Sequence, residues 1–352
     1  MPMINAIRMI NNLTAGTMTA AQLQTALATA ETYGEWQQLM QFRGSVRQLF
    51  ASTEAATAVA NSALSTPSAA TGTGSATGGT LAAATYYVKI VAVDIAGNTT
   101  NAGAESTGVT TTGSTSSIAY TWPAVSGAVS YQIWYGTTSG TEANYYTSAT
   151  NSFTLTAASG TAGTLPTVNN ASTAMTAVAA SSTAMTAVAA SSTAMTAVAA
   201  SSTAMTAVAA SSTAMNAVIA SATARSAIYN SDTALNAISA SATAITTITG
   251  NAAYQTLVNQ NSTTTATAIG FTGNAIIVKL SQSWSNSSGT NMVIGNLRSG
   301  TAISGTENNS VSYNATAGVP ENTWVLPAQS TAVQSNTAGS IGSTLNIGYI
   351  YV

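Results

Sequence analysis

The chain has 352 residues, of which 7 are lysine or arginine and 9 are aspartate or glutamate, and it contains neither histidine nor cysteine. This composition excludes an imidazole base, a thiolate nucleophile, a disulfide framework and the usual zinc sites. A net charge of -2 offers no basic face to nucleic acid. We therefore expect a protein that is not an enzyme, holds no cofactor or metal and binds no nucleic acid.

The first residues, Met-Pro-Met-Ile-Asn-Ala-Ile-Arg, lack the charged, apolar and small segments of a secretory signal in that order. No window approaches the roughly 18 consecutive apolar residues of a membrane-spanning helix. We expect a soluble protein without membrane insertion, which would leave a cell by a route other than a classical signal.

Residues 1 to 65 are predicted to be helical. Over Thr19–Phe50 the apolar positions recur mostly at three- and four-residue steps, with expected breaks at Gly34 and Gly44. So short a unit buries little surface by itself, which leaves two interpretations: a small helical domain, or an apolar stripe that docks on a partner. The stripe consists of Trp36, Leu39, Met40, Phe42, Val46, Leu49 and Phe50.

Residues 66 to 82 are rich in Ser, Thr and Gly and are predicted to be a flexible linker. Residues 83 to 168 then change to strand periodicity. Tyr86–Val93 alternates, similar runs follow at Ser117–Trp122, Tyr131–Tyr135 and Ser152–Thr156, and turns rich in Gly, Asn and Ser separate them. This pattern predicts an antiparallel β-sandwich.

Two motifs in the predicted sandwich resemble a fibronectin type III module. Tyr-Tyr-Val-Lys-Ile-Val-Ala-Val-Asp-Ile-Ala-Gly-Asn, from Tyr86, is similar to its late strands, and Trp-Pro-Ala-Val-Ser-Gly-Ala-Val-Ser-Tyr, from Trp122, to its early strands. Trp122 takes the place of the core tryptophan. Because the late motif comes first, either the module is circularly permuted or its first hairpin completes the sheet from the N-terminal side. The resemblance implies a spacer; the alternative is a binder of carbohydrate or protein.

Eight consecutive decapeptides fill residues 171 to 250, and four of them carry Ser-Thr-Ala-Met-Thr-Ala-Val-Ala without change. A fixed short period indicates stacked similar units. Each residue in the methionine position is followed three positions later by Val or Ile, a spacing that shares a face on a helix but not on a strand. The predicted stalk core is Met175, Met185, Met195, Met205, Met215, Leu235 and Ile245.

The length of the repeat bears on its conformation. Ten residues at about 100° each fall about 80° short of three full helical turns, so a straight continuous helix would lose its apolar stripe. We favour about two helical turns followed by a kink, and keep a strongly supercoiled helix and a β-solenoid as alternatives. Residues 52 to 61 fit the same frame.

A core of alanine and methionine this thin is expected to need self-association, as a homotrimer. Arg225 interrupts the methionine column, and we expect it to meet Asp232. One interpretation of that pair is a solvated surface contact of negligible energy. The other is that it fixes the register between chains or holds an anion between them.

Residues 251 to 352 are predicted to be a second β domain. The expected strands are Asn274–Ser283, Asn291–Leu297, Asn322–Leu326 and Ser343–Val352, and the last of them is expected to be paired. Three aromatic residues lie in or beside polar loops, where they serve either as packing or as platforms for a glycan or surface receptor. They are Trp284, Tyr313 and Trp324.

The layout predicts a multidomain elongated fibre with helical head, sandwich, repeat rod and β tip. It resembles bacteriophage tail fibres and related virion fibre proteins. The resemblance is carried by the Ser-x-Thr-Ala-Met-x-Ala-Val repeat, the Trp-x-x-Val-x-Gly-Ala-x-Ser-Tyr module and the Leu-Asn-Ile-Gly-Tyr-Ile-Tyr-Val ending. It implies a trimer in an extracellular particle assembled in the host cytoplasm. It further implies that residues 1–65 anchor on baseplate, tail or neck proteins and residues 251–352 contact a host glycan or protein.

Other functions stay open at this point. One is a head-decoration or neck fibre without receptor binding. Another is a bacterial surface adhesin, which would need a signal or cell-wall anchor that the sequence does not show. A glycosidase tip is disfavoured, because Glu307 and Glu321 have no partner acid nearby except each other, 14 residues apart.

Overall fold

The computed structural model is a mixture of helices and antiparallel sheets. It describes residues 2–29, 33–261, 268–271, 273–283, 290–294, 298, 311–315, 321–322, 326–328, 331–336 and 343–352. The chain divides into two compact units, Met1–Val178 and Ala179–Val352. Each unit is described by itself below.

Five helices begin the first unit: α1 (Pro2–Thr14), α2 (Ala20–Thr29), α3 (Tyr33–Met40), α4 (Arg43–Leu49) and α5 (Thr53–Ala60). A reciprocal cap starts α2, because the Gln22 N–H donates to Thr19 Oγ1 and the Thr19 N–H donates to Gln22 Oε1. The helix pairs α1 and α4, and α2 and α5, pack together. Apolar residues at three- and four-residue spacing therefore meet in one helical core.

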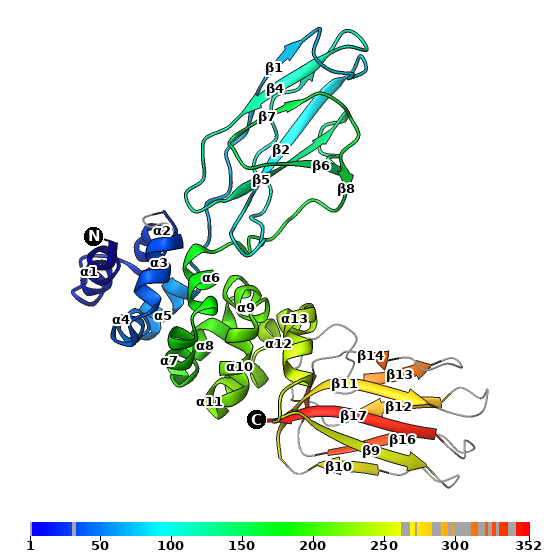
Figure 1. The fold of residues 1–352 in the computed structure, drawn as a ribbon. Helices are drawn as coiled ribbons and strands as arrows, with labels where there is room; N and C mark the ends of the chain where they lie inside the picture. Colours follow the sequence, from blue (N-terminus) through cyan, green and yellow to red (C-terminus); the bar gives the residue numbers. More distant parts are fainter. Residues whose placement is uncertain are drawn as a thin grey trace. The chain divides into compact units, whose positions relative to one another are not determined.

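Two sheets follow in the same unit, and they pack face to face (Figure 1). One has the order β1-β4-β7 and the other β3-β2-β5-β6-β8. The core between them contains the inward residues of β2, Tyr86, Val88 and Ile90, and also Trp122, whose ring meets Tyr131 edge to face at 5.3 Å. The predicted β-sandwich and its core tryptophan are confirmed. The strands are β1 (Thr71–Ser75), β2 (Thr85–Val93), β3 (Val109–Thr110), β4 (Ser117–Thr121), β5 (Ser130–Gly136), β6 (Asn144–Ser148), β7 (Ser152–Leu155) and β8 (Thr161–Ala162).

The prediction of a flexible linker over residues 66–82 is wrong. The segment contains β1, which pairs with β4 along its whole length, and Leu81, which is buried in the sandwich core. The glycines that suggested flexibility have a packing role. A Cβ on Gly72 would lie 2.6 Å from Cε1 of Tyr120 and 2.8 Å from Cγ2 of Val109, so only glycine fits beneath that ring.

The order of the sandwich strands bears on the two topologies left open by the sequence. β2, which carries the motif similar to late strands, pairs with β5, whereas β1 pairs with β4. The strands before residue 111 therefore contribute to both sheets. A single early hairpin added to the edge of one sheet does not describe this arrangement.

The sandwich is inserted between two short helices, α5 and α6 (Thr173–Ala180). The chain leaves the helices at Ser62 and returns beside it, because the Leu64 N–H donates to the Ala171 carbonyl at 2.8 Å and Ser172 Oγ donates to the Ser62 carbonyl. α5 has the decapeptide frame, with Ser52 Oγ accepting from the N–H three residues on. The sandwich thus interrupts the helices at a boundary between repeats.

Asp94 fixes the sandwich to the start of α6. Asp94 is only 2% exposed. Its Oδ2 accepts hydrogen bonds from the Ser172 N–H and from Thr176 Oγ1, each at 3.1 Å. Oδ1 accepts from the N–H groups of Ala96 and Asn98 in its own turn. A buried carboxylate with this many donors holds both segments in one geometry.

The second unit begins with seven short helices, one in each decapeptide. Consecutive helices are bent by 102° between α7 and α8 and by 101° between α9 and α10. In each, the serine before the helix accepts a hydrogen bond from the N–H three residues on. The kinked alternative is the one found. The helices are α7 (Ser182–Ala189), α8 (Ser192–Ala200), α9 (Ser202–Ala209), α10 (Ser212–Ala220), α11 (Ala222–Tyr229), α12 (Asp232–Ser239) and α13 (Ala242–Thr249).

These helices stack with three to a superhelical turn, since α7 packs on α10, α8 on α11, α9 on α12 and α10 on α13 (Figure 1). The capping serine also joins successive turns. Oγ of Ser211, Ser221 and Ser241 donates to the carbonyl 32 residues earlier at 2.6 or 2.7 Å, and Ser231 does the same. One hydroxyl therefore both caps its own helix and binds the turn below.

The predicted stalk core is buried within one chain. The five methionines are at most 1% exposed and Leu235 is fully buried, whereas Ile245 is half-buried at the last helix. Stacking of the turns supplies the neighbours that a single short helix lacks. The methionine core consequently needs no second chain to cover it.

The C-terminal strands form two antiparallel sheets, with the orders β10-β16-β12-β13 and β14-β11-β17-β9, and β15 also pairs with β11. The predicted pairing of the last strand is confirmed, since β17 lies between β11 and β9. The strands are β9 (Gln255–Asn261), β10 (Ala268–Phe271), β11 (Ala275–Ser283), β12 (Thr290–Ile294), β13 (Val311–Ala315), β14 (Glu321–Asn322), β15 (Leu326–Ala328), β16 (Thr331–Asn336) and β17 (Ser343–Tyr351).

Candidate functional site

The apolar stripe predicted to anchor the N-terminal domain is core, with one exception. Six of its seven side chains are at most 4% exposed in the helical core, and only Phe42 is exposed, at 51%. The prediction of a docking stripe is therefore wrong for Trp36, Leu39, Met40, Val46, Leu49 and Phe50. The physical reason is that the five helices pack against one another and cover the stripe.

The aromatic residues predicted to bind a receptor fall mostly outside the described residues. Trp284 and Trp324 are not among them, and neither is Glu307 of the glycosidase alternative. Tyr313 lies in β13, opposite Met292 of β12. Glu321 lies in β14, opposite Ser281.

The expected contact between Arg225 and Asp232 is not formed; each binds the C-terminal β domain instead. Nε of Arg225 donates to the Tyr351 carbonyl at 2.6 Å, and its Nη1 donates to the Ile219 carbonyl. Asp232 forms an ion pair with Arg298, which also donates to the Asn230 carbonyl at 2.7 Å. Two positions at which the repeat departs from its consensus, Arg225 and Asp232, thus hold the following domain.

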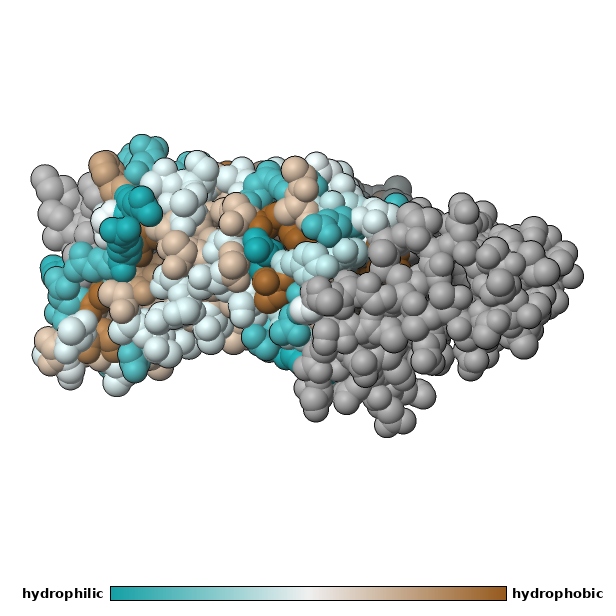
Figure 2. Space-filling model, turned by 90° about the horizontal axis from the view of Figure 1, so that it is seen from below, coloured by the Kyte–Doolittle hydropathy of each residue, from teal (hydrophilic) through white to brown (hydrophobic). Residues whose placement is uncertain are grey.

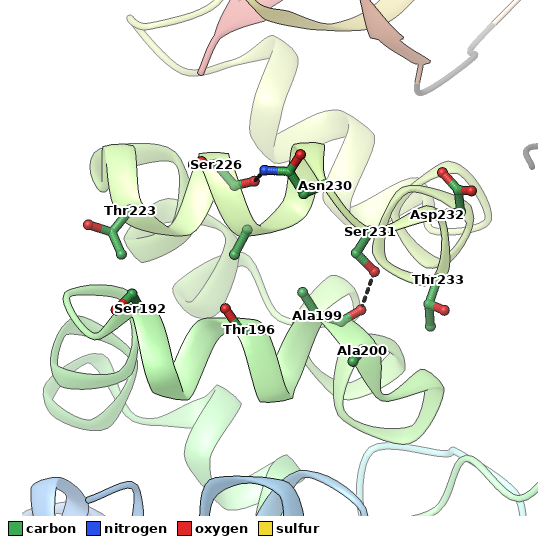
Figure 3. A pocket seen from close by; sticks show the side chains of 11 residues that line it. Ser192, Thr196, Ala199, Ala200, Thr223, Ser226, Asn230, Ser231, Asp232 and Thr233 are labelled. Atoms are coloured by element: carbon green, nitrogen blue, oxygen red, sulfur yellow. Dashed lines mark hydrogen bonds between the residues drawn. The ribbon is translucent and has the colours of Figure 1, made fainter. Parts of the chain in front are cut away.

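A groove lies beside this junction, between α8 on one side and α11 and the start of α12 on the other (Figure 3). Its volume is about 550 Å³. Its lining consists of hydroxyl, amide and methyl groups with one carboxylate, that of Asp232, which is paired with Arg298. The lining residues are Ser192, Thr196, Ala199, Ala200, Thr223, Ser226, Ala227, Asn230, Ser231, Asp232 and Thr233.

The surface is largely neutral. Figure 2 shows a face whose coloured part is mostly pale, with small hydrophilic and hydrophobic areas between. Of the eight decapeptides, only two residues are charged, Arg225 and Asp232. The helices therefore present mainly hydroxyl groups, and few charged groups, to the solvent.

A cluster of charged side chains that the sequence does not reveal lies on the outer face of the β2-β5 sheet. Nζ of Lys89 lies 3.0 Å from Oε2 of Glu142, whose side chain is 0% exposed. Glu105 accepts from Ser139 Oγ at 2.6 Å and from the Gly140 N–H at 2.8 Å. The neighbouring Glu142 carboxyl, together with the hydrogen bonds from Ser139 and Gly140, lowers the pKa of Glu105 to about 2.

These residues come from three places in the chain, and the outermost two, Lys89 and Glu142, are 53 positions apart. Alternation marks Lys89 as outward-facing, but no local pattern brings two loop carboxyls to it. Within the described part of the chain, no three His, Cys, Asp or Glu residues gather in a way that would hold a metal ion.

No family model and no curated protein matches this chain. Among the described residues, no single helix has the length and apolar character needed to cross a membrane.

Proposed function

We propose that the chain is a structural fibre protein of a virion, of the phage tail-fibre type, which holds a β domain away from its point of attachment for contact with a host. The observation that carries the proposal is the serine that caps one helix and binds the preceding turn. It joins each turn of three decapeptides to the preceding turn by the same bond, so that added repeats lengthen one continuous stack, which suits a spacer.

The junction at the end of the helices supports the presenting role. Arg225 of α11 binds the Tyr351 carbonyl of β17, and Arg298, which precedes β13 in the chain, pairs with Asp232 of α12. A domain fixed by an ion pair and carbonyl contacts transmits the orientation of its support. A tip on a flexible tether would not.

The neutral repeat surface supports a spacer over a catalyst. Its hydroxyl and methyl groups supply neither an acid–base pair nor an activated nucleophile. In this proposal the first 65 residues attach to other virion proteins, with Phe42 as the one exposed large apolar residue of the stripe. Residues 251–352 contact a host glycan or protein, and the chains associate as a homotrimer, as the resemblance to virion fibres implies, although the buried methionine core does not require it.

Imaging tests the attachment. Particles that carry a gold-binding tag at the N-terminus of this chain should show the label on the tail or baseplate. A label on the head or neck would support the head-decoration or neck-fibre alternative instead. Particles without the chain would contradict a virion role.

Binding tests the tip. Purified full-length protein should bind susceptible cells and reduce infection, whereas a control chain ending at Gly250 should do neither. Equal binding by both chains would place recognition outside the C-terminal domain and contradict that part of the proposal.

A further inference from the structure

The bond between successive turns of the decapeptide helices keeps one register. Oγ of Ser211, Ser221, Ser231 and Ser241 donates in each case to the carbonyl 32 residues earlier. The helices that follow these serines range from Ser-Thr-Ala-Met-Asn-Ala-Val-Ile-Ala in α10 to Ala-Thr-Ala-Ile-Thr-Thr-Ile-Thr in α13. The register therefore depends on the length of the decapeptide and not on its exact sequence.

Three helices complete one superhelical turn, because each helix packs on the third helix after it. The direction of the chain thus rotates by about a third of a turn for each decapeptide, in keeping with the bends of 102° between α7 and α8 and 101° between α9 and α10. Residues thirty positions apart return to the same side of the stack. Thr186 of α7, Asn216 of α10 and Thr246 of α13 form such a set, and all three are exposed. The number of decapeptides therefore decides which side the last helix reaches.

The C-terminal strands are fixed to the last helices and turn with them. The Tyr351 carbonyl at the end of β17 accepts from Nε of Arg225 on α11 at 2.6 Å. Arg298 pairs with Asp232 of α12 and donates to the Asn230 carbonyl at 2.7 Å. α13 also packs against β11. A domain held by three consecutive helices follows their orientation.

We propose that the number of decapeptides sets the direction in which the C-terminal β domain points from the stack. One added decapeptide turns the β domain by about a third of a turn, and two turn it by about two thirds. Three restore its direction and move it outward by one superhelical turn, about 8 to 10 Å, the usual distance between packed helices. The proposal rests on the proposed spacer function only in that the part turned is the one that would contact a host.

The stack can accept an added decapeptide without losing a contact. Each consensus decapeptide supplies the capping serine and, at its ninth residue, the carbonyl that accepts from the serine of a later turn. A second copy of residues 201–210 therefore binds the turns on either side as its neighbours do. In a stack of this kind, where each unit contacts only nearby units, an added consensus unit maintains or raises the stability.

Distances measured by pulsed electron paramagnetic resonance on the full chain test the rotation. The chain has no cysteine, so spin labels attach only where a cysteine is introduced. Three double variants combine Asn274→Cys, at an exposed residue just before β11, with Thr186→Cys on α7, Thr196→Cys on α8 or Thr206→Cys on α9. Further copies of residues 201–210 are inserted after Ala210, and an excess of unlabelled chain removes distances between chains.

The order of the three distances, from shortest to longest, is the readout. One inserted copy should permute this order by one position and two copies by two, whereas three copies should restore it and lengthen all three distances. An unchanged order with one copy would overturn the proposal, because the extra decapeptide would then be looped out of the stack. Distributions too broad to be ordered would also overturn it, since the β domain would not follow the helices.

An insertion of seven residues, Ser-Ser-Thr-Ala-Met-Thr-Ala, at the same point is the matched control. It has the composition of the repeat but moves every later serine out of register with its carbonyl. Its urea midpoint of unfolding should be below that of the wild type, whereas the chains with ten added residues should match or exceed the wild type. Equal midpoints for seven and ten added residues would contradict the fixed register. These measurements use the purified chain alone, so their outcome is independent of the imaging and cell-binding tests of the proposed function.

Discussion

At the scale of single residues, the repeat depends on its first serine more than on its methionine. The methionine column and its burial follow from a spacing of three to valine, which is visible in the sequence. The second bond of the serine hydroxyl is not visible there, because its acceptor lies 32 residues earlier, one superhelical turn away. The bend between consecutive helices determines how many residues make one superhelical turn, and this angle cannot be read from the sequence.

Ser211→Ala should destabilise the second unit by about 2 to 3 kcal/mol. The change removes an N-cap, which accounts for about 1 kcal/mol, and leaves the Ala179 carbonyl without its donor, which adds about 1 to 2 kcal/mol. Ser212→Ala, at the exposed neighbouring serine, should change stability by less than about 0.5 kcal/mol. Urea unfolding followed by far-ultraviolet circular dichroism measures both, and equal effects would contradict the double role of Ser211.

At the scale of elements, β1 shows where composition misleads. Residues 71–75 read Thr-Gly-Thr-Gly-Ser, which is typical of a linker. The first of their glycines, Gly72, is required by Tyr120 on β4, 48 positions later in the chain. By contrast, β2, β4, β5 and β7 were predictable, because alternation with buried aromatic and branched residues is a local property.

Gly72→Ala should destabilise the first unit by about 1 to 3 kcal/mol, since the added methyl group overlaps the Tyr120 ring. Gly113→Ala is the matched control, because a Cβ there meets nothing within 4 Å, and it should be neutral or slightly stabilising. Thermal unfolding followed by tyrosine and tryptophan fluorescence compares the two. A neutral Gly72→Ala would show that β1 does not pack beneath Tyr120.

At the scale of the whole molecule, the sandwich is an insertion at a repeat boundary. The frame of residues 52–61 is visible in the sequence, and so is the return of the repeat at residue 171. That the two ends of the insertion lie side by side is not visible, because it depends on three contacts between residues more than 100 positions apart. The same holds for the junction formed by Arg225 and Arg298.

Deletion of residues 63–171 should leave a folded helical protein. The new bond joins Ser62 to Ser172 and creates Ser-Ser-Thr-Ala-Met-Thr-Ala-Val-Ala-Ala, the consensus decapeptide. The shortened chain should keep its helical circular dichroism per helical residue and unfold cooperatively. The control is a chain that lacks residues 67–171, because this deletion does not restore the ten-residue frame at the new junction. The control should be less stable than the chain that lacks residues 63–171. Loss of cooperative unfolding in both would contradict an insertion.

The central position of β17 sets an order of events during synthesis. β9 and β11 flank this strand and are made about 60 to 90 residues before it, so their sheet cannot close until residue 351 has left the ribosome. The decapeptide helices make their contacts within about 32 residues and can assemble while the chain is still growing. The helices are then already in place as a template when the last strand arrives, and the slow, long-range pairing becomes the step most exposed to aggregation.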